Sequence, residues 1–386
     1  MNIIPVAADE HRVHAPVVVP LPRAGTGGRI EGLDGLRALA VSVVYLSHLP
    51  IALQSLGNDG WFQNFPHAGF LGVNLFFVMS GFLITHRLLV TSHPGDRPAL
   101  RRFWVHRAAR ILPAVTVFLA VHAIYAVVAG FPPYGSIFDE FLMVASTLLQ
   151  FPNYAILADI DNLFDNGALW SLGVEGQFYV VWPLITWFFL RKVRRPEWVV
   201  VALVVVIAIL SRHRAGVFDA HGSFDAYLRT DTRIESLIIG AVGAWAWMRT
   251  DRVPIRAMRV LTLPALAAMV AIFLNATQWS TFIWHWGMTA FDLCALIVIL
   301  ALATGGSPVR RILEWRPIAW VGMVSYGLYI WQVPVLHILS RHADSLGTAT
   351  KGVISVSATF ALATVSWYAV EKPIRSSALV ARLSGN

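Results

Sequence analysis

Apolar residues run through most of this chain in long stretches, separated by short polar segments. Residues 199–211 and 288–306 carry a single charged residue between them, and such stretches approach the ~20 residues that a helix needs to cross a bilayer core. The pattern predicts ten membrane helices, near residues 36–56, 69–90, 111–130, 169–190, 197–213, 234–249, 260–275, 288–306, 318–339 and 352–371.

Composition supports this assignment. Hydrophobic residues make up 56% of the 386 positions and charged residues only 13%, against roughly a quarter charged in a soluble domain. A conventional soluble enzyme is therefore excluded, and the predicted fold class is an all-α, polytopic transmembrane helix bundle.

The basic residues predict the topology, because short cytoplasmic loops accumulate Lys and Arg. If the N-terminus is cytoplasmic, only six basic residues fall outside: Arg212, Arg214, Arg229, Arg233, Arg341 and Lys351. We therefore expect ten crossings of an inner (plasma) membrane, with both termini in the cytoplasm. Topology explains the net charge of +8, so no nucleic-acid partner is expected.

One apolar stretch does not fit this alternation. Residues 141–157 are apolar, but no basic residue lies between Arg110 and Arg191, and an extra crossing would break the charge pattern. We expect a re-entrant or interfacial segment near residues 137–157.

The predicted domain organisation is simple. Residues 1–30 are read as a disordered cytoplasmic tail, residues 31–376 as one membrane domain and residues 377–386 as a short cytoplasmic tail. Cys294, the only cysteine, lies in an apolar run and is read as an inert core residue, so no disulfide and no metal site are expected.

Ionisable residues inside membrane helices are costly, so each one is a candidate functional residue. Arg37 and His48 are eleven residues apart in the first helix, close to three turns, which puts both on one face. A neutral histidine is the usual general base near neutral pH. The alternative is that Arg37 reaches to the lipid headgroups and that His48 is a hydrogen-bonded core residue.

Two further pairs share a helix face. Ser171 and Glu175 lie one turn apart, and Glu175 could orient the histidine, bind a sugar hydroxyl or simply bond to a neighbouring helix. Arg107 and Arg110 follow the second helix, and their guanidinium groups suit the phosphates of coenzyme A. The alternative for this pair is ordinary positive charge on the cytoplasmic side.

A last cluster alternates in sign where a helix begins on the expected outer side. It includes Arg229, Asp231, Arg233 and Glu235. These side chains either bind a glycan substrate or pair with one another.

Seven segments, in this order, resemble the acyltransferase 3 family of bacterial membrane enzymes, which acylate surface glycans and related acceptors. The segments are GLDGLRALAVSVVYLSH, GFLGVNLFFVMSGFLI, FWVHRAARILP, LWSLGVEGQFYVVWP, TRIESLIIG, VSYGLYIWQVP and VEKPIR, and they extend over about residues 30–376. The resemblance implies that His48 is the essential catalytic residue and that Arg37 is essential beside it. It also implies a catalytic role for Glu175, which matches a glutamate of the family's WSL-x-VE segment. It also implies that Arg107 and Arg110 grip acyl-CoA on the cytoplasmic side.

Three positions depart from the family pattern. Asn74 replaces a frequent acidic residue, Gly176 a frequent second glutamate and Gln332 a frequent histidine. These differences are expected to bear on the choice of acceptor.

The function expected is therefore O-acyl transfer from cytoplasmic acyl-CoA, most simply acetyl-CoA, to a hydroxyl of a cell-envelope glycan or glycolipid. No permanently bound cofactor is expected. Four alternatives stay open at this point: transport of an acidic solute or lipid-linked sugar, acylation of a small secondary metabolite, non-catalytic glycolipid binding, and a longer acyl donor. His48 itself would act either as a base or as a nucleophile that carries the acyl group.

Overall fold

The computed structural model describes residues 30–53, 68–91, 98–129, 136–158, 168–190, 196–249, 255–305, 307–343 and 345–385. Over these residues the secondary structure is entirely helical, which confirms the predicted all-α class. The tail predicted at 1–30 lies almost wholly outside the described residues. The tail predicted at 377–386 contains a short helix, α17 (Ala378–Ser384).

Each of the ten predicted segments overlaps at least one helix, and the segment at 318–339 overlaps two. The long elements are α1 (Leu33–His48), α2 (Phe70–Thr91), α3 (Pro98–Ala129), α6 (Trp170–Ile185), α7 (Pro196–His221), α9 (Thr230–Arg249), α10 (Ile255–Asn275), α11 (Met288–Ala303), α14 (Ser325–His342) and α15 (Thr348–Val365). The short ones are η1 (Leu49–Ile51), α4 (Ile137–Leu148), α5 (Pro152–Leu157), α8 (Ser223–Leu228), α12 (Arg310–Leu313), α13 (Arg316–Met323) and α16 (Lys372–Arg375). Single π-helical turns follow α6 and α15, as η5 (Thr186–Leu190) and η7 (Ser366–Glu371), and another, η6 (Ile283–Gly287), precedes α11.

Six helices among the described residues are long and apolar enough to cross a membrane. They cover Phe70–Val90, Leu100–Val128, Glu197–His221, Arg256–Asn275, Ile283–Ala303 and Thr348–Arg375, and the bent pair α13 and α14 would make a seventh. The chain is therefore described as a multi-pass membrane protein. Ten crossings and cytoplasmic termini stay predictions, since α1 and α6, for example, have only 16 residues each.

The sequence predicts one membrane helix at 318–339 that must kink, since it contains Pro334. The structure has two helices, α13 and α14, bent by 67° at a break between Met323 and Ser325. Val324 leaves the helical conformation there, with φ −91° and ψ 5°. Gly322 brings α13 against the backbone of Asp34 in α1, so tertiary packing sets this bend.

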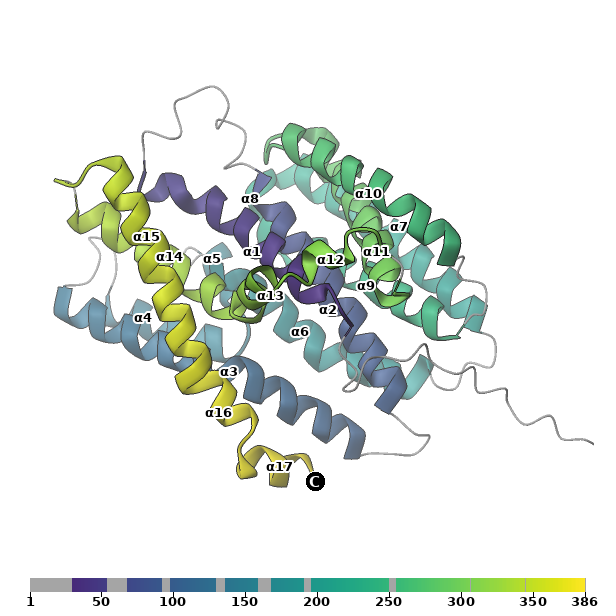
Figure 1. The fold of residues 1–386 in the computed structure, drawn as a ribbon, viewed down its shortest axis with the longest axis horizontal. Coiled ribbons are helices and arrows are strands. Elements are labelled where there is room, and N and C mark those ends of the chain that lie inside the picture. The colour runs from purple at the N-terminus through teal and green to yellow at the C-terminus, as the bar shows by residue number, and fades with distance from the viewer. Residues whose placement is uncertain are drawn as a thin grey trace, which may run out of the picture.

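Helix α2 occupies the centre of the bundle. It packs against α1, α6, α9 and α11, and Figure 1 shows α1 and α2 between a group containing α3, α14 and α15 and a group containing α7, α9, α10 and α11. The contact with α9 is close because Gly81 faces the backbone of Leu237 and Gly240 faces the backbone of Val78. Small residues permit such backbone approach between membrane helices.

The segment at 137–157 forms two short helices. A capping box starts α4, in which Ser136 and Asp139 bond to each other's backbone, and the hydrogen bonds from Ser136 lower the pKa of Asp139. Gln150, with φ 64°, turns the chain into α5. Gly176 of α6 gives room for the Gln150 side chain. Neither helix alone reaches the length of a membrane span. The re-entrant or interfacial placement of the whole segment stays a prediction.

The close contact of α2 and α9 makes a stability prediction. A Cβ at Gly240 would overlap the Val78 carbonyl, so Gly240→Ala should destabilise the fold by about 1–3 kcal/mol. Gly216 of α7 has open space around it, so Gly216→Ala should leave stability unchanged or raise it by up to ~1 kcal/mol. Thermal unfolding of both variants in detergent measures the difference, and equal melting temperatures would contradict this packing.

Candidate active site

Five of the residues predicted for the site line one cavity in the centre of the bundle. Arg37, Arg107, Arg110, Ser171 and Glu175 come together there from α1, α3 and α6, around about 70 Å³ of water-accessible space. The remaining wall comes from α2 and α14 and adds five hydroxyl groups, which belong to Ser80, Ser325, Tyr326 and Tyr329 and to Tyr179 of α6. Charged and hydroxyl groups thus face a cavity whose walls are otherwise largely apolar.

Glu175 is held in place by two hydroxyl groups. Ser80 Oγ of α2 donates a hydrogen bond to Glu175 Oε1 at 2.8 Å, and Tyr179 OH, one turn along α6, donates to Oε2. The Tyr179 carbonyl in turn accepts a hydrogen bond of 2.9 Å from Trp104 Nε1 of α3. The carboxylate therefore bonds to a neighbouring helix and also faces the cavity.

Ser171 and the tyrosines of α14 join three helices. Ser171 Oγ and Tyr329 OH lie 2.6 Å apart, and Tyr329 also donates to the Ala168 carbonyl at 2.8 Å. Tyr326 donates to the Ile111 carbonyl of α3 at 3.0 Å. Sequence reasoning missed the parts played by Tyr179 and Tyr329, and the only signal for Tyr179 was its position one turn after Glu175.

The two arginines of α3 also line a second, larger cavity. Arg107 lies over the ring of Tyr179, with 4.9 Å from its guanidinium carbon to the ring centroid. On the other side, Arg107 and Arg110 line about 440 Å³ of space together with Phe103, His106, Ala109, Arg87, Trp367, Lys372, Arg375 and Ser376. We call this second space the basic chamber. It shares Arg107 and Arg110 with the central cavity, so the two spaces adjoin.

The end of α15 shapes one wall of the basic chamber. The π-helical turn η7 changes the register of the helix, as such turns often do at functional sites. Arg375 then lies over the ring of Trp367, at 5.3 Å from its centroid, and the buried Glu371 accepts a hydrogen bond of 3.1 Å from Ser366. From sequence, Lys372 and Arg375 indicated topology only.

Arg37 and His48 occupy different places on α1. Arg37 pairs with Asp34 at 2.7 Å and lines the central cavity. His48 is the last residue of α1, about 16 Å further along the axis, and faces Gln332 and His337 of α14. It does not line the central cavity. His48 Nδ1 and Gln332 Oε1 are both buried without a hydrogen-bond partner among the described residues.

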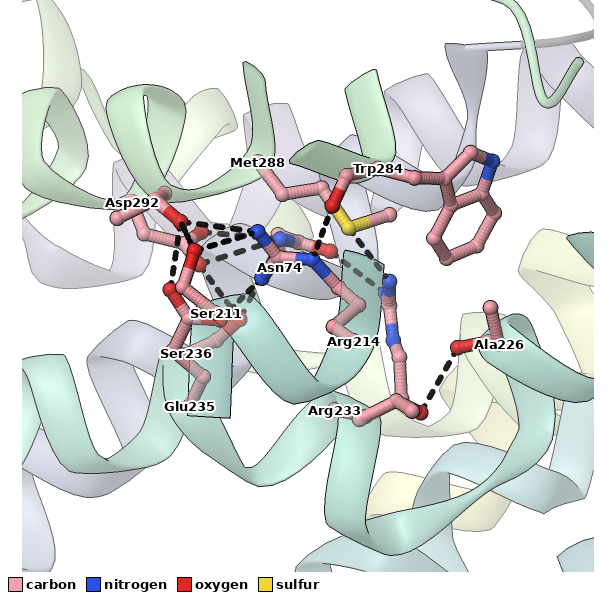
Figure 2. A network of polar contacts seen from close by, with 12 residues as sticks. Asn74, Ser211, Arg214, Ala226, Arg233, Glu235, Ser236, Trp284, Met288 and Asp292 are labelled. Carbon is pink, nitrogen blue, oxygen red and sulfur yellow. Dashed lines mark hydrogen bonds and ion pairs between the residues drawn. The ribbon is translucent and has the colours of Figure 1, made fainter. Parts of the chain in front are cut away.

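Arg233 and Glu235 lie in a separate, fully buried network. Glu235 forms an ion pair with Arg214 of α7 and accepts a hydrogen bond of 2.6 Å from Thr289 of α11. Arg214 also donates to the Trp284 carbonyl at 2.8 Å. Figure 2 shows Arg214 among the side chains of this network, next to the Trp284 carbonyl.

Asn74 completes this network from α2. Its carbonyl oxygen accepts a hydrogen bond of 2.6 Å from Arg233, and its amide donates to Asp292 at 3.0 Å. Ser236 donates to the same carboxyl group at 2.6 Å. An acidic residue in place of Asn74 would face Asp292, so the neutral amide, which bonds to both partners, fits this chain.

Two arginines and two acidic residues thus join α2, α7, α9 and α11 away from the central cavity. Arg233 is also enclosed by the rings of Trp170, Tyr227 and Phe77, at 5.4–6.0 Å from their centroids. A substrate role for Arg233 and Glu235 stays a prediction. The contacts that the structure shows for these two residues join neighbouring helices. Sequence reasoning missed Arg214 and Asp292, although an aspartate within an apolar run was a signal for such a network.

No group of three or more His, Cys, Asp or Glu side chains among the described residues could hold a metal ion. The cavities offer hydroxyl, carboxylate and guanidinium groups, which suit an organic, anionic substrate.

Comparison with known proteins covers nearly the whole chain. Residues 30–371 match a family model described as an acyltransferase domain. Peptidoglycan O-acetyltransferase OatA of Listeria monocytogenes is 28% identical over 371 residues, and putative peptidoglycan O-acetyltransferase YrhL of Bacillus subtilis is 30% identical over 372 residues. O-acetyltransferase OatA of Staphylococcus aureus is 26% identical over 359 residues.

These relatives are longer proteins. The matches cover 92%, 90% and 90% of this chain, but only 57%, 55% and 57% of the three relatives. The chain therefore spans little more than half of their length. No solved structure matches it.

The buried network makes a second prediction, which separates a structural role from substrate binding. Glu235→Gln leaves Arg214 as a buried charge without its partner, which should destabilise the fold by about 3–5 kcal/mol. Asp219→Asn is the matched control, because it removes an exposed pair with His285 and should cost at most about 1 kcal/mol. Chemical or thermal unfolding measures both variants. A Glu235→Gln protein of wild-type stability would show that the network is not structural.

Proposed function

Since this chain belongs to the acyltransferase domain family, we propose that it is a membrane O-acyltransferase, which moves an acyl group to a hydroxyl of a cell-envelope glycan. The three named relatives are all O-acetyltransferases, and two carry peptidoglycan in their names. Acetyl is therefore the proposed group, and a peptidoglycan-type glycan is the proposed acceptor. The proposed setting is the inner (plasma) membrane.

The proposed donor is acyl-CoA, which would enter through the basic chamber. The observation that carries this proposal is that Arg107 and Arg110 border both the basic chamber and the central cavity. Coenzyme A has phosphates at one end and a thioester at the other, so it fits a cationic space that adjoins a hydroxyl-lined one. Guanidinium groups bind phosphates through paired hydrogen bonds.

The rest of the chamber suits a nucleotide. Arg87, Lys372 and Arg375 add three cationic side chains to the shared pair, and Phe103 and Trp367 add aromatic faces. Phosphates would bind to the cationic groups, and the adenine base would stack against an aromatic ring. The thioester arm would then pass Arg107 and Arg110 into the central cavity, beside Arg37 and Glu175, and its acyl end would extend beyond this cavity towards His48.

His48 would supply the reaction chemistry at the far end of α1. As a base, it takes the proton from the acceptor hydroxyl, whose oxygen attacks the thioester carbonyl carbon. The carbon–sulfur bond then breaks, and the proton passes to the thiolate sulfur. As a nucleophile, His48 would instead attack the thioester carbon, forming an acyl-imidazole as the carbon–sulfur bond breaks, and the proton lost from the ring would pass to the thiolate. The acceptor oxygen would then attack the acyl carbon, the carbon–nitrogen bond would break, and the hydroxyl proton would return to the imidazole.

Release of free thiol is the third prediction and tests the proposed activity. Purified protein in detergent or nanodiscs should release coenzyme A from acetyl-CoA and transfer radiolabelled acetyl to cell-envelope glycan. His48→Ala should lose at least 100-fold of this activity, because proton transfer by a positioned base contributes 10²–10⁴-fold. A thiol assay and scintillation counting of the glycan measure the two products. His48→Ala with wild-type activity would overturn the role proposed for His48. A wild type that neither binds nor cleaves acetyl-CoA would overturn the proposed activity and favour a transporter.

The basic chamber makes the fourth prediction. Arg87→Gln and Arg375→Gln should each raise the KM for acetyl-CoA about tenfold or more, because a hydrogen bond to a charged group contributes about 1.5–3 kcal/mol. Arg256→Gln is the control, since this exposed arginine at the start of α10 lies outside the chamber. The increase should shrink at high salt, where exposed charges are screened. Unchanged KM values for both chamber variants would place the donor elsewhere.

A further inference from the structure

Tyr179 of α6 lies where the central cavity meets the basic chamber. Its side chain is buried and lines the central cavity. Arg107 borders both spaces and contacts an aromatic ring on each side, since Phe103 lines the basic chamber and Tyr179 lines the central cavity. The guanidinium carbon is 4.9 Å from the ring centroid of Tyr179 and 5.8 Å from that of Phe103. The ring of Tyr179 therefore supports, from the side of the central cavity, an arginine that both spaces share.

The hydroxyl group of the same side chain bonds to Glu175. Tyr179 OH donates to Glu175 Oε2, and Ser80 Oγ donates to Oε1 at 2.8 Å. Each carboxylate oxygen thus has one donor within the protein, and each can accept a further hydrogen bond. Because both oxygens are held, the direction in which the carboxylate faces the central cavity is fixed.

Tyr179 is itself anchored to the helix that carries Arg107. Its backbone carbonyl accepts a hydrogen bond of 2.9 Å from Trp104 Nε1 of α3. Trp104 lies three residues before Arg107, which is about one turn of the helix. Two contacts therefore join Tyr179 to the same part of α3, one through its carbonyl group and one through its ring.

The guanidinium group of Arg107 is held without using its hydrogen-bond donors. Within the described part of the chain, Arg107 forms no hydrogen bond or ion pair, so its N–H groups remain available for an anion. A cation over an aromatic face is attracted by the ring, which orients the side chain and leaves these donors unoccupied. If Glu175 turned towards Arg107, its carboxylate would compete with the donor phosphates for the guanidinium group.

We propose that Tyr179 is a positioning residue with two separable roles in acyl transfer. Its ring holds Arg107 for the anionic donor, and its hydroxyl group keeps Glu175 directed at the donor arm. This inference rests on the proposed function, because the donor has to pass Arg107 to reach the central cavity. Tyr179 makes and breaks no bond in the reaction and acts only through these two neighbours.

The fifth prediction separates the ring from the hydroxyl group by steady-state kinetics. Tyr179→Phe keeps the aromatic face but removes a donor to Glu175, so the kcat for acetyl transfer should fall about tenfold while the KM for acetyl-CoA stays at its wild-type value. Tyr179→Leu also removes the aromatic face, so the KM for acetyl-CoA should in addition rise about fivefold. Ser80→Ala removes the other donor to Glu175 and should lower kcat in the same way as Tyr179→Phe, which gives an independent test of the carboxylate.

Tyr125→Phe is the matched control. It also removes a hydroxyl group that joins two helices, because Tyr125 OH and His342 Nε2 are hydrogen-bonded at 3.0 Å between α3 and α14. Tyr125 lines neither the central cavity nor the basic chamber, so this variant should keep the wild-type kcat and KM.

A binding measurement tests the role of the ring without turnover. Isothermal titration of the full chain in nanodiscs with coenzyme A should give a Kd for Tyr179→Leu that is about fivefold above the wild-type value. Tyr179→Phe should bind coenzyme A as the wild type does. Thermal unfolding of each variant shows whether it is folded under the conditions of the titration.

The possible results separate this inference from the proposed function. A wild-type kcat in Tyr179→Phe overturns the role of the hydroxyl group, and a wild-type Kd for coenzyme A in Tyr179→Leu overturns the role of the ring. Equal changes of kcat and KM in both variants would show a structural role only and would also overturn the inference. A wild type that neither binds coenzyme A nor cleaves acetyl-CoA would overturn the proposed function, and this inference with it.

Discussion

A charged side chain inside a membrane bundle must find a partner or face a cavity, and this constraint governs the structure. Where Arg214, Arg233, Glu235 and Asp292 meet, each guanidinium and carboxyl group is bonded within the bundle. Removing one partner would leave an uncompensated charge at low dielectric, which costs several kcal/mol. The four helices that supply this network are therefore fixed relative to one another.

Helix α2 connects this network to the site. Asn74 joins Arg233 to Asp292 on one face, while Phe76 and Ser80 line the central cavity on another. Gly81 and Gly240 bring the backbones of α2 and α9 close together. Ser80, which donates to Glu175, thus lies on a helix whose position is fixed by both charge pairing and close packing. Such support from packed neighbours gives a site the rigidity that acyl transfer needs.

Three arginines outside this network face cavities. Arg107 and Arg110 border two adjoining spaces, and Arg37 faces the central one. Because a bundle tolerates such groups only where they are solvated or bound to substrate, their arrangement marks a route from the basic chamber into the central cavity. The donor in the proposed acyl transfer follows this route.

Much of the fold could be predicted from sequence, because helix length and apolar runs are local signals. Spacing and the family resemblance also pointed to Arg107, Arg110, Ser171 and Glu175 as candidates, but not to their convergence on one cavity. Features that depend on tertiary packing could not be predicted in this way. The break at Val324 follows from packing of Gly322 against α1, and the apolar pattern runs across it without interruption.

Charged residues were the hardest to interpret. Arg87, Lys372 and Arg375 match the charge pattern of cytoplasmic loops. Nothing in the sequence therefore showed that their side chains line one chamber. Arg214 was counted as an outside residue, but it is buried in an ion pair. The contact of Arg107 with Tyr179 was overlooked because it links two helices that are far apart in the sequence.

A structure determined with a non-hydrolysable acetyl-CoA analogue, in which a ketone replaces the thioester, tests the central claim most directly. The account predicts phosphate density beside Arg87 and Arg375, with the arm passing between Arg107 and Arg110 and the ketone in the central cavity towards His48. Nucleotide density at any other place, or an arm that leaves the central cavity empty, would contradict it.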